Sequence, residues 1–206
     1  MIAIVDYGMG NLGSVYNMLR RVNVDARVTS DPSVIREAEK IVLPGVGAFD
    51  NGMKSIALLG LKEVLDEAVL GRGTPVLGIC LGMQLMTARS EEGELPGLNW
   101  IKADTIRFRF PEEKRHLKVP HMGWNSLVIT RENPLLACFE EKPRFYFVHS
   151  YYVSCRDPND LLATCEYGIV FPAAIACGNI MGTQFHPEKS HRFGMRVLKN
   201  FAEMAP

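Results

Sequence analysis

The first 80 residues alternate between short apolar runs and segments in which apolar residues recur every three or four positions. Continuous apolar runs are typical of strands buried on both faces, and they span residues 2–5, 26–30, 40–43 and 75–80. Helical spacing is found between them, at Val15, Met18, Leu19 and Val22, at Val34, Ile35 and Ala38, and at Leu61, Val64, Leu65 and Ala68. This alternation predicts a parallel sheet with helices on both faces.

The second half of the chain has a different pattern, with β-rich segments separated by glycine, proline and asparagine. These segments span residues 105–110, 126–130, 145–153, 162–166, 173–176 and 180–185. They predict a meander or an antiparallel extension of the first sheet. A last amphipathic helix is indicated by Phe193, Val197, Phe201 and Met204. Because no repeat, linker or low-complexity segment interrupts the chain, we expect one domain over residues 1–206.

Residues 75–84, PVLGICLGMQ, join the fourth predicted strand to a helical segment. The GxCxG motif stands where hydrolases carry GxSxG, the sharp turn that pushes a nucleophile out of a sheet. Gly78 and Gly82 leave room for this turn and for close approach of strand and helix. The helix N-terminus adds unpaired N–H groups that favour a thiolate at Cys80. The alternative is a buried structural cysteine.

A cysteine nucleophile needs a base, and the base needs a group that orients it. The five candidate histidines are His116, His121, His149, His186 and His191. His186 is the best placed because it ends a predicted strand, and Glu188 follows two residues later. Pro187 fixes the backbone between them. We therefore expect His186 as the base and Glu188 as the carboxylate that holds its tautomer; a surface turn is the alternative.

Oxyanion stabilisation requires backbone N–H groups near the nucleophile. The N–H of Leu81 is one candidate, since it follows Cys80 directly. The loop Gly45-Val46-Gly47 comes after the third predicted strand, and strands of a parallel sheet end at the same edge. We expect a second N–H from Val46 or Gly47, because glycine tolerates unusual backbone angles. The alternative is a plain strand-to-helix turn.

A glycine-rich loop near the N-terminus, Gly8-Met9-Gly10-Asn11-Leu12-Gly13, matches GxGxxG. Asp31 lies about twenty residues further on, as in dinucleotide-binding folds. However, Asp31 is followed by Pro32 and a helical segment, so it is equally well explained as a helix N-cap. A dinucleotide-binding oxidoreductase therefore stays a weaker alternative, and the glycines are otherwise explained by a loop that approaches the backbone of another molecule.

Composition narrows the possible partners. The chain is 47% hydrophobic, and its 23 basic residues balance 23 acidic ones, so nothing favours nucleic acid or anionic lipid. The sequence begins without the charged region of a signal peptide and contains no membrane-length apolar run, so we expect a cytoplasmic protein. Five cysteines without CxxC spacing indicate neither a disulfide framework nor a zinc site. We expect no metal and no cofactor.

Five motifs together resemble the class I glutamine amidotransferases, and more narrowly the glutaminase subunits of imidazole glycerol phosphate synthases. They are GICLGMQ at 78–84, PGVG at 44–47, PHMGWN at 120–125, FVHSY at 147–151 and QFHPEKS at 184–190. The resemblance extends over nearly the whole chain. It implies a flavodoxin-like three-layer α/β/α sandwich with a β-rich extension, and hydrolysis of L-glutamine to glutamate and ammonia.

The same resemblance assigns roles to individual residues. It implies a triad of Cys80, His186 and Glu188. Residues expected near bound glutamine are Gln84, Gly45, Ser150 and Tyr151. Residues expected at the interface with a partner, a (βα)8-barrel cyclase that forms a heterodimer and uses the ammonia, are Asn11, Trp124, Tyr146 and Lys189. The motifs leave the acceptor open, because similar glutaminase subunits supply ammonia for surface-sugar modification.

Overall fold

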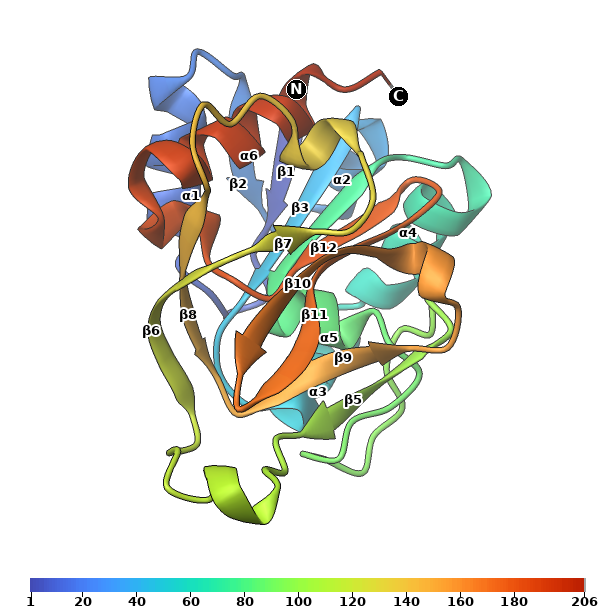
Figure 1. The fold of residues 1–206 in the computed structure, drawn as a ribbon. Coiled ribbons are helices and arrows are strands. Elements are labelled where there is room, and N and C mark those ends of the chain that lie inside the picture. Colours follow the sequence, from blue (N-terminus) through green and yellow to red (C-terminus); the bar gives the residue numbers. More distant parts are fainter. Residues whose placement is uncertain (206) are drawn as a thin grey trace.

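An eight-stranded sheet forms the centre of the computed structural model, which describes residues 1–205 (Figure 1). The strand order is β2-β1-β3-β4-β12-β11-β10-β7. Five strands run parallel: β1 (Ile2–Val5), β2 (Ala26–Thr29), β3 (Lys40–Gly45), β4 (Val76–Cys80) and β12 (Ile180–Thr183). Three antiparallel strands extend them: β11 (Ile169–Cys177), β10 (Leu161–Tyr167) and β7 (Val128–Ile129). The parallel part has flavodoxin-like order, as the family resemblance implied.

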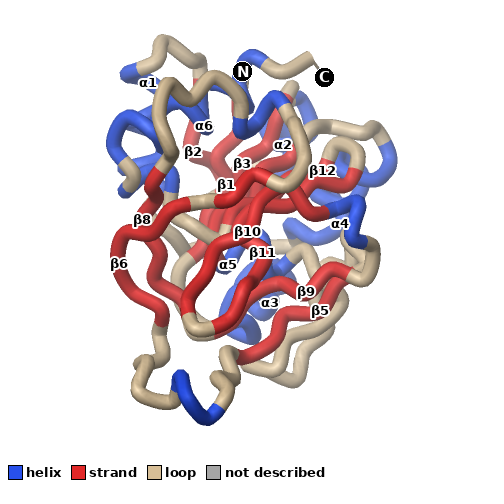
Figure 2. The backbone as a smooth tube through the Cα atoms, viewed as in Figure 1, coloured by secondary structure: helices blue, strands red, loops and turns tan. Residues whose placement is uncertain are grey.

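Helices cover both faces of this sheet, which gives the predicted three layers (Figures 1 and 2). One face carries α1 (Leu12–Arg21) and α6 (His191–Glu203), which pack against each other. The other face carries α2 (Pro32–Glu37), α3 (Phe49–Leu58), α4 (Leu61–Asp66) with its π-helical continuation Glu67–Gly71, and α5 (Leu81–Leu85). The central strands β1 and β3 are therefore buried between two layers of helices.

Two hydrophobic cores explain why the first strands are apolar without interruption. In β1, Ile2 and Ile4 belong to the core under α1 and α6, whereas Ala3 and Val5 belong to the core under the other helices. Successive side chains of a strand point to opposite faces, so a strand with a core on each side has no position for a polar residue. All four residues of β1 are buried.

The β-rich second half also forms two separate two-stranded sheets. β5 (Ala103–Arg107) pairs with β9 (Tyr151–Cys155), and β6 (His121–Ser126) pairs with β8 (Arg144–His149). The predicted single strand over 145–153 was wrong, because its two halves pair with different partners and Ser150 lies at the break. The short helical turns are Glu112–Lys114, Pro134–Leu136, Pro158–Asp160 and Pro187–Lys189.

Two elements were not predicted from the apolar periodicity, although a helix at the first of them was implied by the strand-to-helix alternative for the Gly45-Val46-Gly47 loop. Helix α3 contains Gly52, a residue that disfavours helix interiors, but a Cβ at this position would lie 3.0 Å from the Leu85 side chain. The glycine therefore allows α3 to approach α5. Strand β6 has no apolar run because its outer residues are exposed, as with Met122. None of the helices described in residues 1–205 is long and apolar enough to cross a membrane.

Candidate active site

Cys80 lies on the predicted sharp turn between β4 and α5. Its φ is +53°, a backbone conformation that residues other than glycine rarely adopt. A Cβ on Gly82 would lie 1.8 Å from the carbonyl oxygen of Leu43, and a Cβ on Gly78 would lie 2.7 Å from the Met83 nitrogen. Both glycines are therefore required for the close packing of the turn, and the predicted elbow is confirmed.

The register of the parallel strands brings three sequence motifs to one point beside Cys80. Across β3 and β4, Gly45 pairs with Cys80. Across β4 and β12, Ile79 pairs with Thr183, so Gln184 emerges next to Cys80. His186 follows two residues later on the same segment. The sequence predicted the strand ends, but only the strand order makes β3 and β12 the two neighbours of β4.

His186 and Glu188 form a buried pair. The Nδ1 atom of His186 lies 2.8 Å from Oε1 of Glu188, and the two side chains are 1% and 2% exposed. Nε2 of His186 is buried and has no hydrogen-bond partner among residues 1–205. Burial alone lowers the pKa of His186, but the negative charge of a Cys80 thiolate and the Glu188 carboxylate together raise it to about 10. The imidazole therefore holds a proton beside Cys80 at neutral pH.

A network around Ser190 holds the His186-Pro187-Glu188 turn in place. The Ser190 hydroxyl donates to the His186 carbonyl at 2.6 Å and accepts from the Tyr146 N–H at 3.0 Å. The His186 N–H donates to the Tyr146 carbonyl at 2.9 Å. The turn is thereby fixed to β8 through the backbone. Sequence reasoning quoted Ser190 within a motif but gave it no role.

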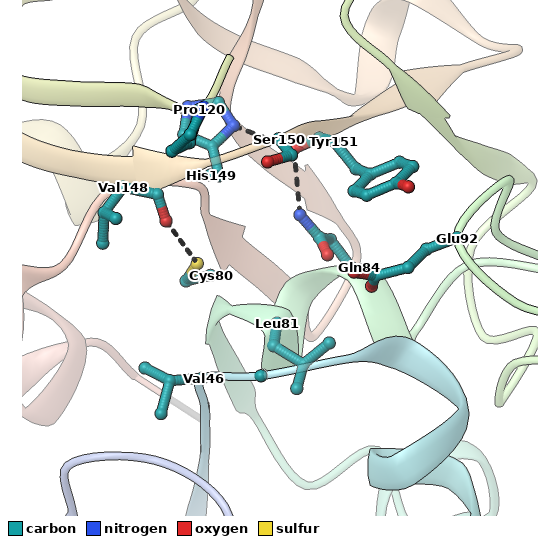
Figure 3. Close-up of a pocket in the computed structure, with 11 residues that line it drawn as sticks. Val46, Cys80, Leu81, Gln84, Glu92, Pro120, Val148, His149, Ser150 and Tyr151 are labelled. Carbon is teal, nitrogen blue, oxygen red and sulfur yellow. Dashed lines mark hydrogen bonds between the residues drawn. The ribbon is translucent and has the colours of Figure 1, made fainter.

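A cavity of about 270 Å³ opens in front of Cys80 (Figure 3). It is lined by Val46, Gly47, Cys80, Leu81, Gln84, Glu92, Pro120, Val148, His149, Ser150 and Tyr151. The residues predicted for the oxyanion site, Leu81, Val46 and Gly47, thus share one cavity with three of the residues predicted near substrate, Gln84, Ser150 and Tyr151. The fourth, Gly45, does not line it: Gly45 is buried in β3, and a Cβ there would lie 2.6 Å from the Tyr7 hydroxyl.

Buried amides connect the cavity wall to the nucleophile. Gln84 Nε2 donates to the Tyr151 carbonyl at 3.0 Å and to Gln184 Oε1 at 3.3 Å. Gln184 Nε2 lies 3.7 Å from Cys80 Sγ, and the Cys80 thiol lies 3.9 Å from the Val148 carbonyl. Sequence reasoning missed Gln184. Its position two residues before His186 was the only available signal.

Glu92 is a second residue that sequence reasoning missed. It is the one carboxylate among the described residues that line the cavity, and its Oε2 accepts from the Phe49 N–H at the start of α3 at 2.9 Å. Glu92 belongs to the acidic run at residues 91–94, which the sequence pattern indicated only as a surface loop. The fold of this loop against α3 brings its carboxylate to the cavity.

Two buried histidines support the cavity wall from behind. His149 Nδ1 lies 2.8 Å from the Tyr151 carbonyl, and His149 Nε2 lies 3.2 Å from His121 Nδ1. Burial lowers the pKa of His149 to about 3 and that of His121 to about 4. Both rings are therefore neutral at physiological pH, in contrast to His186.

Three of the four predicted interface residues lie together. Trp124 is 40% exposed and packs edge-on against Tyr146, with ring centroids 6.3 Å apart. Lys189 Nζ lies 5.7 Å from the Tyr146 ring centroid. His191 stacks on Trp124 at 5.4 Å. Asn11 has an exposed position at the start of α1, where its side chain makes no capping hydrogen bond.

The glycine loop before α1 packs against this chain's own backbone. A Cβ on Gly10 would lie 3.1 Å from the carbonyl carbon of Pro44, directly before the predicted oxyanion loop. Asp31 accepts a hydrogen bond from the Ser33 N–H at 2.8 Å, which confirms it as the N-cap of α2. Both features are thus accounted for within the fold. Within residues 1–205 there is no cluster of three or more His, Cys, Asp or Glu side chains that can hold a metal ion.

The elbow, the buried His–Glu pair and the cavity at the carboxyl ends of parallel strands are the features that the resemblance to glutamine amidotransferases implied. The class-I glutamine amidotransferase family matches residues 3–205, and the chain belongs to this family. It is 52% identical to imidazole glycerol phosphate synthase subunit HisH 2 of Pseudomonas aeruginosa, over 99% of this chain and 100% of the relative. It is 50% identical to imidazole glycerol phosphate synthase subunit HisH 2 of Methanococcus maripaludis, over the full length of both.

The fold also matches solved structures of distant sequence. A glutamine amidotransferase from Thermotoga maritima superposes with a TM-score of 0.66 at 20% identity. The match covers 97% of this chain and 81% of that one. At this identity the likeness shows the fold alone, and the fold is the predicted one.

Proposed function

We propose that this chain hydrolyses L-glutamine through a triad of Cys80, His186 and Glu188. The observation that carries the proposal is the strained Cys80 turn beside a buried histidine whose Nδ1 is held by a carboxylate and whose Nε2 is unpaired. A nucleophile, a base and an orienting acid in this arrangement are the requirements of acyl transfer. Membership of the amidotransferase family supports glutamine as the acyl donor.

The cavity offers groups for an amino-acid substrate. Glutamine has an α-ammonium group, and the Glu92 carboxylate is the natural partner for it among the lining residues. Ser150, Tyr151 and Gln84 provide the remaining polar wall. The carboxamide is then directed to Cys80, next to Leu81 and the Val46-Gly47 loop. We therefore assign substrate binding to Glu92 as well as to the residues expected from the sequence.

The chemistry follows from the protonation state of the pair. The Cys80 thiolate attacks the carboxamide carbon, and N–H groups of Leu81 and of the Val46-Gly47 loop stabilise the oxyanion. His186, protonated as its raised pKa requires, gives its proton to the leaving nitrogen, so ammonia departs and a glutamyl thioester remains. His186 then takes a proton from water, whose oxygen attacks the thioester. Glutamate leaves, and the thiolate and imidazolium are restored.

We further propose that the ammonia passes to a (βα)8-barrel cyclase bound as a one-to-one partner. Ammonia released into water is protonated and lost to chemistry, so an enclosed route is favoured. Support comes from the exposed Trp124 and Lys189, which both contact the half-buried Tyr146 ring beside the catalytic turn. Exposed aromatics near a site are frequent interface anchors. Asn11 is assigned to the same interface.

Histidine biosynthesis is the pathway that the comparisons favour, because both relatives described above are named imidazole glycerol phosphate synthase subunits. Supply of ammonia for surface-sugar modification stays the alternative, because the motifs that define the glutaminase do not identify the acceptor. All five cysteines are free thiols, which supports the expected cytoplasmic location.

The partner can be tested by reconstitution with an imidazole glycerol phosphate synthase cyclase subunit. We expect glutamate release to rise by orders of magnitude when cyclase and its acceptor ligand are added. Trp124→Ala should then release more than one glutamate per product formed, because ammonia escapes. Val128→Ala, which removes an exposed apolar side chain on the edge strand β7 of the main sheet, is the control and should keep the ratio at one. A cyclase that leaves glutamate release unchanged would refute the histidine-pathway partner.

A further inference from the structure

Gln184 is fully buried and lies beside the nucleophile, but the chemistry above gives it no role. The pairing of Ile79 with Thr183 places the next residues of the two segments, Cys80 and Gln184, side by side. Gln184 Nε2 is 3.7 Å from Cys80 Sγ, which is a hydrogen-bond distance for sulfur. A buried amide has to satisfy both its donor and its acceptor groups, so its surroundings decide what it does to the sulfur.

The orientation of the Gln184 amide is fixed by its neighbours. The Tyr151 carbonyl only accepts, so Gln84 must present its NH₂ group there, at 3.0 Å. The other N–H of the same NH₂ group then points to Gln184, which must offer its oxygen at 3.3 Å. The NH₂ group of Gln184 is thereby turned toward Cys80. The amide donates to the sulfur rather than accepting from it.

The Tyr151 carbonyl, which accepts from Gln84, also accepts a hydrogen bond from the histidine pair His149 and His121. His149 Nδ1–H donates to the Tyr151 carbonyl, so His149 Nε2 has no proton and accepts from His121 Nδ1–H. His121 Nε2 in turn accepts from the Asn125 amide at 3.4 Å, and that amide also donates to the Glu166 carbonyl at 2.8 Å. The side-chain donors of Asn125, His121, His149 and Gln84 thus each meet an acceptor. Such fully connected networks hold their members in one orientation.

We propose that Gln184 is a further catalytic residue, whose amide N–H donates to the Cys80 sulfur in an orientation set by Gln84 and the Tyr151 carbonyl. The inference rests on the proposed function, because it takes Cys80 as the nucleophile. A hydrogen bond to the charged form of a group favours that form. Gln184 therefore stabilises the attacking thiolate from one side while His186 acts from another.

The experiment measures alkylation of Cys80 by iodoacetamide against pH in the full chain, by mass spectrometry, together with kcat and KM for glutamate release. Gln184→Met keeps the length of the side chain and removes the donor. Gln184→Glu keeps the shape and supplies an O–H donor only while its carboxyl is protonated. Thr183→Val is the matched control, since it removes a buried hydrogen bond to the Phe185 carbonyl on the same strand without reaching the sulfur.

We expect Gln184→Met to move the alkylation profile to higher pH by about one unit and to lower kcat by about 10- to 100-fold, with KM nearly unchanged. Gln184→Glu should react like the parent at acidic pH and lose reactivity as the introduced carboxyl ionises. Thr183→Val should keep the parental profile. If Gln184→Met, or Gln184→Glu should the first variant not fold, keeps the parental profile and kcat at every pH, the inference is refuted. The proposed function fails separately, if Cys80→Ala still releases glutamate.

Discussion

Glu188→Gln tests the origin of the raised pKa of His186. The two side chains are almost fully buried and meet at 2.8 Å, so the carboxylate acts on the imidazolium with little screening. An opposite charge at this distance shifts a pKa by about 1–3 units, which corresponds to about 1.4–4 kcal/mol. Glutamine keeps the volume and can still accept from Nδ1–H, but it has no charge. The substitution therefore removes the charge interaction with His186 and keeps the packing of the side chain.

The direction of the pKa change in Glu188→Gln follows from the negative charge of Glu188. Glu188 raises the pKa of His186, so its neutral replacement lowers that pKa. The alkaline limb of kcat/KM, which in the parent lies near the pKa of about 10, should move toward neutral pH by about 1–3 units. kcat/KM at pH 10 should fall at least about fivefold, because about half of the parental His186 but no more than about a tenth of the variant's His186 is protonated there. Because His186 then loses its proton at lower pH, less of the enzyme can protonate the leaving ammonia.

Glutamate release is measured from pH 6 to 10.5, with the partner present where it stimulates turnover. Glu203→Gln is the control, because Glu203 lies on the same C-terminal segment and is 63% exposed. The control should keep the parental profile. An alkaline limb that stays in place in Glu188→Gln would show that Glu188 does not set the charge of His186, and the assigned role would be wrong.

Two further predictions concern stability. Gly82→Ala should lower the free energy of unfolding, measured in urea, by about 3 kcal/mol or more, because the new Cβ would lie 1.8 Å from the Leu43 carbonyl oxygen. Gly13→Ala is the control and should be neutral or stabilising, since a Cβ there meets no described atom within 4 Å. Because the pKa of His121 is lowered to about 4, folded His121 binds fewer protons than unfolded His121, and its stabilisation is lost as pH falls from about 6.5 to 4. His121→Phe should therefore reduce the slope of stability between pH 6 and 5 by about 1.4 kcal/mol per unit, while exposed His116→Gln should not; an unchanged slope would contradict a neutral buried His121.

The sheet of the first half could be predicted because burial on both faces leaves a continuous apolar signal, as in residues 2–5 and 75–80. The elbow could be predicted because Cys80 stands between two glycines whose conformational demands are local. The Asp31 cap is local in the same sense. These features depend on interactions between residues that are close in the sequence, so they can be recognised from the local pattern of residue types.

Other features depend on which segments become neighbours. Gln184 acts on Cys80 only because β12 pairs with β4, and Glu92 reaches the cavity only because its loop folds onto α3. Neither residue has a spacing that indicates chemistry. Helix α3 was missed because Gly52 weakens its local signal, while the reason for that glycine is a tertiary contact with Leu85. The break at Ser150 likewise follows from the change of strand partner.

The central claim is that Cys80 forms the bond to glutamine. The most direct measurement compares glutamine-dependent and ammonia-dependent product formation in the reconstituted complex of the parent, Cys80→Ala and Cys138→Ala, the last being an exposed free cysteine that serves as control. We predict that Cys80→Ala lowers glutamate release by at least about 10³-fold and leaves the ammonia-dependent reaction intact, with Cys138→Ala unchanged in both. Glutamate release at the parental rate in Cys80→Ala would contradict the claim.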